Sequence, residues 1–287
     1  MSCNSSDIEA LQSIFQETGV ISDKNFISKG CNIKYKTCHD CTWGTWEIGG
    51  SYSFFNNYLS DLKISGYNIT QFPSGLSKIK KLDLLNLGFN KISSIPIYEN
   101  LKSITSLNLS VNNFKGSLPK ELNNYNNLGY INLQANYLDN IQKDSFNNLK
   151  NLTQLDLNFN NFTGYLPLEI NQFKNLNELD MGVNNLTNIY EKGYDNLKGC
   201  SMNLTMNCIS FTENSANKFM NNFSTYNLDQ NCILPNQYGL KGITYKNCIS
   251  CNNCKGVKAK QLEIQTININ GSSLQIDYGM VSKDICP

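Results

Sequence analysis

The chain has 287 residues, carries 24 lysines against 23 acidic residues for a net charge of +1, and contains no arginine. Because acidic and basic residues are interspersed, the sequence indicates neither a nucleic-acid partner nor binding to an anionic membrane surface. No apolar run approaches the roughly 18 residues of a membrane span and no signal peptide is recognisable, so we expect membrane attachment only through an anchor outside this chain.

We predict an N-terminal cap over residues 1–58. Helical spacing places four apolar side chains on one face of a helix: Ala10, Leu11, Ile14 and Phe15. With Asp7 before them and Cys41-Thr-Trp43-Gly44 after them, these residues resemble the N-terminal cap of plant receptor ectodomains, whose motif is C-x-W-x-G-V-x-C. Trp46-Glu47 stands where that family has its closing cysteine, so we expect Cys41 to pair with Cys31 or Cys3 instead. Such a cap covers the open end of a repeat stack.

Between Leu59 and Ile209 the pattern L-x-x-L-x-L-x-x-N-x-L recurs seven times, at spacings of 22 to 24 residues. The copies begin at Leu59, Leu82, Ile104, Leu128, Leu152, Leu176 and Gly199. This consensus and period are the signature of the leucine-rich repeat, and the alternating x-L-x-L-x core contributes one short strand per copy. We therefore predict an α/β fold in which residues 59–209 form a curved leucine-rich-repeat solenoid of about seven parallel strands. A disulfide-stapled cap is expected at each end, followed by a small cysteine-rich β tail.

The ninth position of the repeat is an asparagine in six of the seven copies. These residues are Asn90, Asn112, Asn136, Asn160, Asn184 and Asn207. An amide both donates and accepts, so each side chain can satisfy backbone groups of its own turn and of the next, and we predict a structural role for this column. Two copies continue as Phe114-Lys-Gly-Ser-Leu-Pro119 and Phe162-Thr-Gly-Tyr-Leu-Pro167, which resembles the plant-type repeat. The alternate copies lack this glycine and proline, so we do not expect a uniform second sheet on the convex side.

Residues 210–234 are predicted to form a C-terminal cap. Aromatic side chains of this segment are expected to cover the last repeat: Phe211, Phe219, Phe223 and Tyr226. A disulfide from Cys200 or Cys208 to Cys232 would fasten the cap to the repeats.

Residues 235–287 are predicted to form a cysteine-rich β-hairpin tail. The segments Gln261–Thr266 and Leu274–Tyr278 alternate between apolar and polar residues, and Asn270-Gly271 lies between them. The spacing of Cys248-Ile-Ser-Cys251-Asn-Asn-Cys254 also fits zinc or an iron–sulfur cluster. In an oxidising compartment disulfides are favoured over both.

All eleven cysteines lie outside the well-formed repeats. They are Cys3, Cys31, Cys38, Cys41, Cys200, Cys208, Cys232, Cys248, Cys251, Cys254 and Cys286. Cysteines confined to the two ends of a solenoid indicate disulfide-stapled caps and hence an oxidising compartment. The odd count leaves one thiol without a partner in this chain. Cys38-His39-Asp40-Cys41 offers too few regularly spaced ligands for structural zinc, so we expect no metal and no cofactor.

Nine N-x-[ST] sequons are candidate glycosylation sites: Asn4, Asn68, Asn108, Asn151, Asn161, Asn185, Asn203, Asn222 and Asn270. A chain with 46 asparagines would contain roughly six or seven sequons by chance, so their number adds little. The prediction that the protein is secreted or displayed at the cell surface therefore depends on the cysteines.

Alternate strand positions of the predicted sheet face its concave side, which makes the third, fifth and eighth positions of the repeat candidate contacts. The eighth position is mainly apolar, and acidic side chains gather at the third and fifth positions of two neighbouring copies. We predict a ligand-binding surface made of Phe89, Tyr130, Gln154, Asp156, Phe159, Glu178 and Asp180. In the alternative interpretation, the eighth position packs into the turn and contacts no ligand.

These features predict a non-catalytic extracellular module that binds a protein or peptide partner in cell-surface recognition, adhesion or signalling. The plant-type repeat also resembles polygalacturonase-inhibiting proteins, which implies, as a first alternative, an inhibitor of wall-degrading enzymes or a polysaccharide binder. A structural coat or matrix component, crosslinked through the cysteine-rich tail, is the second alternative. An enzyme is not expected, because His39 is the one histidine and the sheet has no Ser-His or Cys-His pair.

Overall fold

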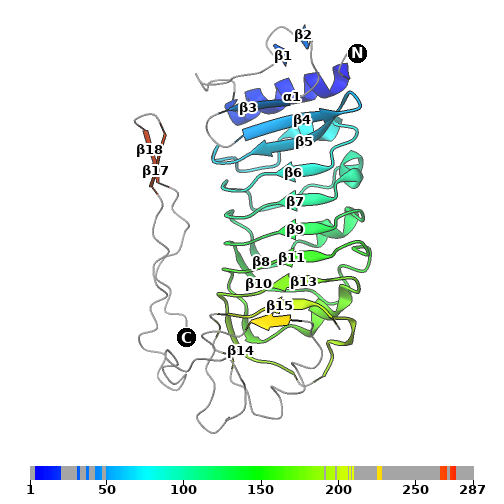
Figure 1. The fold of residues 1–287 in the computed structure, drawn as a ribbon, viewed down its shortest axis with the longest axis vertical. Coiled ribbons are helices and arrows are strands. Elements are labelled where there is room, and N and C mark those ends of the chain that lie inside the picture. Colours follow the sequence, from blue (N-terminus) through cyan, green and yellow to red (C-terminus); the bar gives the residue numbers. More distant parts are fainter. Residues whose placement is uncertain are drawn as a thin grey trace. The chain divides into compact units, whose positions relative to one another are not determined.

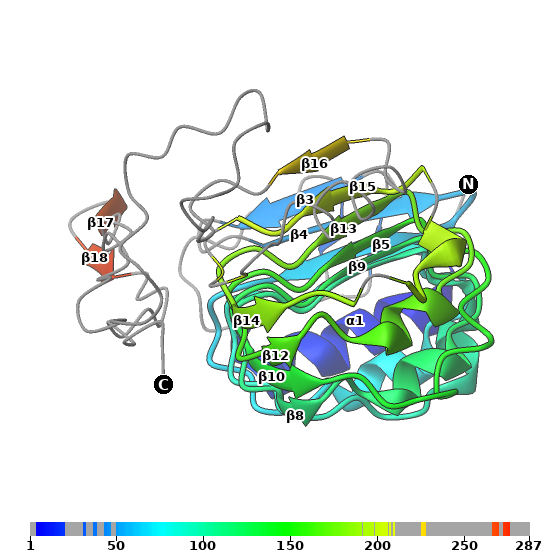
Figure 2. The same ribbon diagram turned by 90° about the horizontal axis from the view of Figure 1, so that it is seen from below.

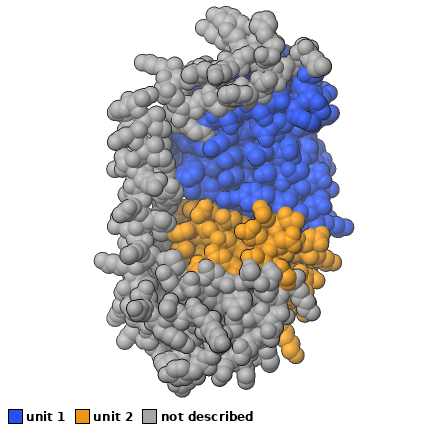
Figure 3. Space-filling view, viewed as in Figure 1, with its two compact units in different colours: residues 1–114, 119–132, 145–152 blue, residues 115–118, 133–144, 153–287 orange. Residues whose placement is uncertain are grey.

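The computed structural model describes residues 4–20, 50–190, 192–197, 199–205, 207 and 209, together with short strands at 31–32, 37–38, 43–46, 225–227, 266–269 and 272–275. The chain divides into two compact units, coloured blue and orange in Figure 3. Unit 1 comprises residues 1–114, 119–132 and 145–152, and unit 2 comprises residues 115–118, 133–144 and 153–287. Among the helices of the described residues, none combines the length and the apolar character needed to cross a membrane.

Unit 1 begins with the predicted amphipathic helix, α1 (Ser5–Thr18). The Asn4 side chain accepts the Asp7 N–H in the first turn, and Gly19 ends the helix with a φ of 77°. The four apolar side chains of the predicted face are all buried: Ala10, Leu11, Ile14 and Phe15. They pack near the 3₁₀ helix η3 (Ser74–Lys78), where a Cβ on Gly75 would lie 2.7 Å from the Ala10 carbonyl oxygen. Only glycine permits this close approach.

Asp7 joins this helix to the first two repeats. Its side chain is buried, and its carboxylate accepts the N–H of Leu59 at 2.9 Å and the N–H of Lys80 at 3.4 Å. Burial raises the pKa of Asp7 above its usual value, although the two backbone donors act in the opposite direction. Asp7, the acidic residue of the segment that resembles the plant cap, therefore has a structural role.

The sheet of unit 1 has the strand order β3-β4-β5-β6-β7-β9 (Figure 1). The strands β3 (Trp43–Trp46), β4 (Gly50–Phe55) and β5 (Tyr58–Ile64) are antiparallel. The strands β6 (Leu84–Asn86), β7 (Ser106–Asn108) and β9 (Tyr130–Asn132) then follow β5 in parallel. The fourth position of the repeat forms the core as predicted, because the residues that occupy it are buried and in register: Leu62, Leu85, Leu107 and Ile131.

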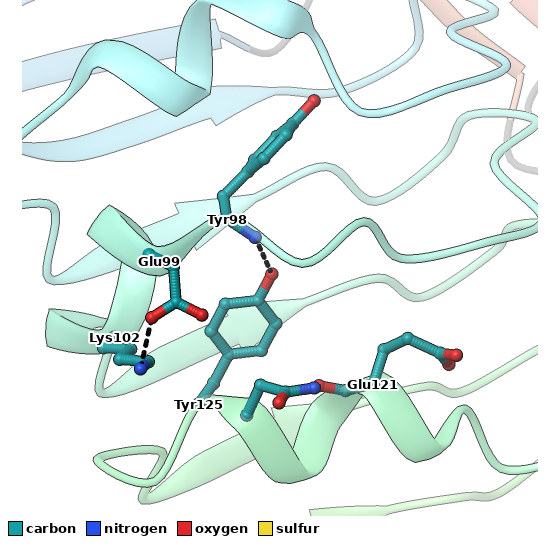
Figure 4. A network of polar contacts seen from close by, with 6 residues as sticks. Tyr98, Glu99, Lys102, Glu121 and Tyr125 are labelled. Atoms are coloured by element: carbon teal, nitrogen blue, oxygen red, sulfur yellow. Dashed lines mark hydrogen bonds and ion pairs between the residues drawn. The ribbon is translucent and has the colours of Figure 1, made fainter.

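A polar contact links two successive repeats of unit 1 through the 3₁₀ helices η4 (Glu99–Ser103) and η5 (Lys120–Asn124). The hydroxyl of Tyr125, at the end of η5, donates to the Pro96 carbonyl and accepts the Tyr98 N–H at 3.3 Å (Figure 4). Burial raises the pKa of Tyr125 above its usual value.

The main sheet of unit 2 has the strand order β11-β13-β15-β16, all parallel. These strands are β11 (Gln154–Asp156), β13 (Glu178–Asp180), β15 (Ser201–Asn203) and β16 (Thr225–Asn227). Two separate parallel pairs are formed by β8 (Lys115–Ser117) with β10 (Tyr137–Asn140) and by β12 (Thr163–Tyr165) with β14 (Asn185–Asn188) (Figure 2). Each pair joins a plant-type copy to the alternate copy after it, so the second sheet is not uniform, as expected. The 3₁₀ helices of this unit are η6 (Leu168–Gln172) and η7 (Asp195–Leu197).

The parallel ladder of unit 2 extends beyond Ile209, where the predicted repeats end. Met202 of β15 lies opposite Tyr226 of β16, in the register that the earlier strands use. The sequence Phe223–Ile233 also fits the repeat pattern, one period after the copy that begins at Gly199. An eighth repeat strand therefore lies within the segment predicted to be a C-terminal cap.

The described residues of the tail include one antiparallel pair of strands. The strands β17 (Thr266–Ile269) and β18 (Ser272–Gln275) pair antiparallel, with Ile269 opposite Ser272. Asn270-Gly271, the dipeptide predicted to form the turn, lies outside the described residues. The two strands lie closer together in the sequence than the alternating segments Gln261–Thr266 and Leu274–Tyr278 do. In unit 1, β1 (Cys31–Asn32) and β2 (Thr37–Cys38) form a second small antiparallel pair.

The asparagines at the ninth position make the predicted backbone contacts. Asn184 is 1% exposed, and its Nδ2 donates to the carbonyls of Met181 and Gly182 in its own turn. The same Nδ2 reaches the Leu157 carbonyl of the preceding copy, and Oδ1 accepts the Phe162 N–H, both at 3.1 Å. One buried amide thus satisfies backbone groups of two successive copies. Equivalent contacts are made by Asn90, Asn112, Asn160 and Asn207.

We expect Asn184→Ala to lower the free energy of unfolding by about 3 kcal/mol or more, because several buried backbone groups lose their partner at once. Urea unfolding followed by circular dichroism measures this change. Asn185→Ala is the matched control, since the Asn185 side chain is half-buried and makes no hydrogen bond among the described residues. It should change stability by no more than about 0.5 kcal/mol. Equal effects of the two substitutions would contradict the structural role of the column.

Candidate functional site

The fifth position of the repeat begins the turn after each strand. Its side-chain Oδ1 accepts the N–H of the residue two positions later, at 2.8 to 3.1 Å, which is an Asx turn. This contact is made by Asn86, Asn108, Asp156, Asp180 and Asn203. The predicted binding residues Asp156 and Asp180 therefore also have a structural role that the sequence analysis missed. The signal was present, because Asn or Asp occupies this position in six of the seven copies, with Lys63 in the first.

The residue at the eighth position of the repeat also shapes the turn. Its residues adopt the left-handed backbone conformation, with φ between 50° and 56° at Phe89, Val111, Ala135, Phe159 and Val183. This conformation is uncommon for bulky and β-branched residues. The N–H of Phe159 donates to the Gly182 carbonyl at 3.1 Å, and both phenylalanine side chains are half-buried. The position thus belongs to the turn, and a ligand contact by Phe89 or Phe159 stays a prediction.

Unit 1 contains two of the predicted binding residues, Phe89 and Tyr130. Tyr130 lies on β9, and its hydroxyl accepts a hydrogen bond from Asn132 Nδ2 at 3.1 Å. The third and fifth positions of β6 and β7 carry only uncharged side chains: Leu84, Asn86, Ser106 and Asn108. The acidic part of the predicted surface is therefore confined to unit 2.

Unit 2 brings the remaining polar residues together on β11 and β13. In the parallel register Gln154 lies opposite Glu178, and Asp156 lies opposite Asp180. Gln154 Nε2 donates to Glu178 Oε2 at 3.1 Å. These three carboxylates with Gln154 form a surface that we call the acidic strip. Within the described residues, no lysine lies within ion-pair distance of it.

Two asparagines support Asp180 from either side. Asn158 Nδ2 and Asn203 Nδ2 donate to Asp180 Oδ2, at 3.1 and 3.0 Å. Asn158 was not predicted as a site residue, although its backbone N–H also donates to Asp156 Oδ1 at 3.0 Å. Its own Oδ1 is buried and has no hydrogen-bond partner within the described part of the chain. These contacts fix the positions of both aspartates.

The surroundings of Asp156 disfavour the charged form of its carboxylate. Burial raises the pKa of Asp156 to about 6, although the hydrogen bond from the Asn158 N–H acts in the opposite direction. The neighbouring charges of Asp180 and Glu178 add to the effect of burial. In other copies an asparagine makes the same Asx turn without a charge, as Asn203 does. The fold therefore does not require a carboxylate at position 156.

The candidate glycosylation sites differ in the exposure of their side chains and in the hydrogen bonds that these side chains make. Asn108 Oδ1 accepts from the backbone and hydroxyl of Ser110, and Asn203 Nδ2 is bonded to Asp180. Asn68 is exposed, with a left-handed φ of 56°, and Asn151 is exposed and donates to the Asn126 carbonyl. Asn4, Asn161 and Asn185 are half-buried, whereas Asn222 and Asn270 lie outside the described residues. Modification of each site stays a prediction.

The cysteine pairing is described only in part. Cys200 is a buried free thiol whose pKa burial raises to about 11. The backbone register of β1 and β2 places Cys31 opposite Cys38. His39 lies outside the described residues. So do the other predicted disulfide residues: Cys3, Cys41, Cys208, Cys232, Cys248, Cys251, Cys254 and Cys286. A bond from Cys208 to Cys232 stays a prediction.

Comparison with known proteins supports the fold assignment. Residues 126–186 match the family model described as leucine rich repeat. The structure of PEPR1 with AtPEP1 is 22% identical with a TM-score of 0.55, covering 83% of this chain and 33% of that chain. A plant ice-binding protein is 20% identical with a TM-score of 0.53, covering 81% of each chain. Both comparisons concern the fold alone, and the fold is that of a leucine-rich-repeat solenoid.

A third similar structure is the ectodomain of the receptor kinase GASSHO1/SCHENGEN3 from Arabidopsis thaliana, solved with CASPARIAN STRIP INTEGRITY FACTOR 2. It is 29% identical with a TM-score of 0.47, covering 62% of this chain and 22% of that chain. The chain thus spans between 22% and 33% of the length of the first receptor structures that it matches. Among curated proteins, none matches the sequence.

We expect Asp156→Asn to stabilise the protein at pH 7.5 by on the order of 1–2 kcal/mol, since it keeps the turn and removes the buried charge. The folded pKa of about 6 exceeds the unfolded value of 3.8, so the folded protein alone takes up a proton between these values. Wild-type stability should therefore rise as the pH falls through this window, and the advantage of the variant should shrink by pH 4.5. Urea unfolding from pH 4.5 to 8 measures both.

Asp139→Asn is the control for this experiment, because Asp139 is exposed on β10. It should leave stability unchanged at every pH. A constant difference between wild type and Asp156→Asn across the range would contradict the buried-charge explanation.

Proposed function

The chain folds as a leucine-rich-repeat solenoid, and we propose that it is a non-catalytic recognition module that binds a protein or peptide through the acidic strip of unit 2. The partner group that fits the strip is a lysine ammonium or an arginine guanidinium. One observation carries this proposal: Asp156 and Asp180 stand where asparagine makes the same turn in other copies. Charge that opposes stability and is not needed by the fold is typical of functional sites.

A cationic side chain would relieve the repulsion within the strip. At about 4 Å, opposite unit charges attract by about 4 kcal/mol at the effective dielectric near a protein surface. Gln154 and Asn203 offer amides next to the carboxylates, and Phe159 follows Asp156 by three positions with a half-buried ring. A bound peptide would thus find charge, hydrogen bonds and apolar contact within three neighbouring repeats.

The proposal also covers the location of the protein and the kind of process in which it acts. Cysteines at both ends of the chain support an extracellular location, in which recognition, adhesion or signalling at the cell surface is the role that we propose. PEPR1, which is similar in fold, was solved with AtPEP1, and a peptide is the class of partner proposed here. The two alternatives, an inhibitor of wall-degrading enzymes or polysaccharide binder and a structural coat component, stay predictions.

The test is selection of binding peptides from a displayed library of random 12-residue sequences on the full chain at low ionic strength. We expect the selected peptides to be enriched in lysine and arginine, because the three carboxylates of the strip have no lysine partner among the described residues. For these peptides, the double variant Asp156→Asn/Asp180→Asn should bind at least tenfold more weakly. Fluorescence anisotropy with labelled peptides gives the dissociation constants.

The matched control removes two exposed carboxylates elsewhere, as Asp139→Asn/Asp144→Asn. It changes the net charge by the same amount and should leave the dissociation constants within a factor of two. If the selected peptides carry no excess of basic residues, or if both double variants bind them equally, the acidic strip is not the binding surface.

A further inference from the structure

Unit 2 also exposes an aromatic surface away from its main sheet. Tyr165 at the end of β12, Tyr190 just after β14 and Leu168 at the start of η6 are 47%, 42% and 38% exposed. The two tyrosine rings stack with a centroid distance of 4.3 Å and an interplanar angle of 22°. We call these three side chains the tyrosine patch.

The patch is held by buried contacts beneath it. Tyr194 is buried, and its hydroxyl donates to the Leu166 carbonyl at 2.8 Å, which joins the segment after β14 to the segment after β12. Gly193 has a φ of 107°, and a Cβ there would lie 2.7 Å from Leu168 Cδ2. The absence of a side chain at position 193 therefore lets Leu168 lie against this loop, so that the patch is preformed.

The repeat itself does not need apolar residues at these places. Two copies earlier, β8 and β10 pair in the same register and with the same irregularity as β12 and β14. The residues equivalent to Tyr165, Leu168 and Tyr190 in that pair are all polar: Ser117, Lys120 and Gln142. The fold thus forms the same strand pair with polar residues at these three places, although Tyr137 at the start of β10 is itself 37% exposed. The tyrosine patch is therefore an addition to the pair. Exposed apolar groups that a fold does not require indicate a contact surface.

The size and charge of the patch restrict what can bind there. Three side chains exposed by about two fifths offer roughly 250 Å², well below the approximately 800 Å² per partner of a stable protein interface. No charged residue lies on β12 or β14, whose remaining polar side chains are hydroxyls and amides: Thr163, Asn185, Thr187 and Asn188. Flat aromatic faces beside neutral hydrogen-bonding groups match the apolar ring faces and the hydroxyls of an uncharged sugar.

We propose that the tyrosine patch binds a neutral polysaccharide, with a sugar ring stacked on the outer face of the tyrosine pair and its hydroxyls bonded to the side chains of β12 and β14. This site is distinct from the acidic strip, because β12 and β14 form a separate sheet from the one that contains β11 and β13. Binding here does not depend on the peptide recognition proposed above. The protein would then hold a glycan chain and a basic peptide at separate surfaces.

The experiment is affinity electrophoresis of the full chain through native gels containing xyloglucan, mixed-linkage β-glucan, galactomannan or, as the charged control, polygalacturonate. Insoluble cellulose and chitin are tested by depletion from solution. The protein is produced without N-glycosylation, so that no glycan on Asn161 or Asn185 covers the surface. We expect retardation or depletion by at least one neutral polysaccharide and none by polygalacturonate.

The decisive variant is Tyr165→Ser/Leu168→Lys/Tyr190→Gln, which installs the residues of the earlier strand pair and should therefore fold. It should weaken polysaccharide binding at least tenfold, with a circular dichroism spectrum like that of the wild type. The conservative variant Tyr165→Phe should retain most of the binding, because the stacking face remains. Phe55→Ser, which removes a 69% exposed ring from unit 1, should have no effect.

Three results would overturn the proposal. No binding to any neutral polysaccharide, or binding that the triple variant retains, overturns the proposal. Self-association of the wild type in sedimentation velocity that the triple variant abolishes would also overturn it, by assigning the patch to a second copy of the chain. Asp156→Asn/Asp180→Asn should leave polysaccharide binding unchanged, so that failure of one proposal is distinguishable from failure of the other.

Discussion

Each strand of this fold ends in a buried turn, and the backbone groups of that turn must find partners away from water. The asparagine at the ninth position supplies them. Asn184 and Asn207 each donate to carbonyls of their own turn and of the copy before, while their oxygens accept an N–H from that earlier copy. The leucines of neighbouring copies can share one core only because the chain turns at the same place every time. Repeat length, strand register and core therefore all depend on this one contact.

The turn constrains the inside of the repeat and leaves part of its surface free. At the fifth position, Asn203 and Asp180 make the same Asx turn, so that geometry does not distinguish a neutral side chain from a charged one. Electrostatics does, since burial and its acidic neighbours raise the pKa of Asp156. Because the copies share one consensus, a residue in one copy can be compared with its equivalents in the others. Where one copy departs from its equivalents at a cost in stability, the departure needs an explanation outside the fold.

The sequence predicts what the period determines. Leucine spacing gave the strands, their inward side chains and the asparagine contacts, and strand alternation placed Asp156 and Asp180 on one surface. It did not predict the left-handed conformation at Val183, because an ordinary valine carries no signal for it. The eighth strand was missed because Tyr226 replaces a leucine and the copy before it is degraded. The stacking of Tyr165 on a residue after β14 depends on how two dissimilar loops fold back, which no spacing rule gives.

The two candidate surfaces of unit 2 differ in a way that points to different partners. The acidic strip lies on rigid parallel strands and carries charge whose free energy improves when a cation approaches. The tyrosine patch carries no charge, and its aromatic faces gain by covering the apolar side of a ligand that is itself neutral. Salt should therefore weaken binding at the strip and leave binding at the patch almost unaffected. Such a difference would let a single solenoid remain attached to a glycan matrix while a basic peptide binds and dissociates independently.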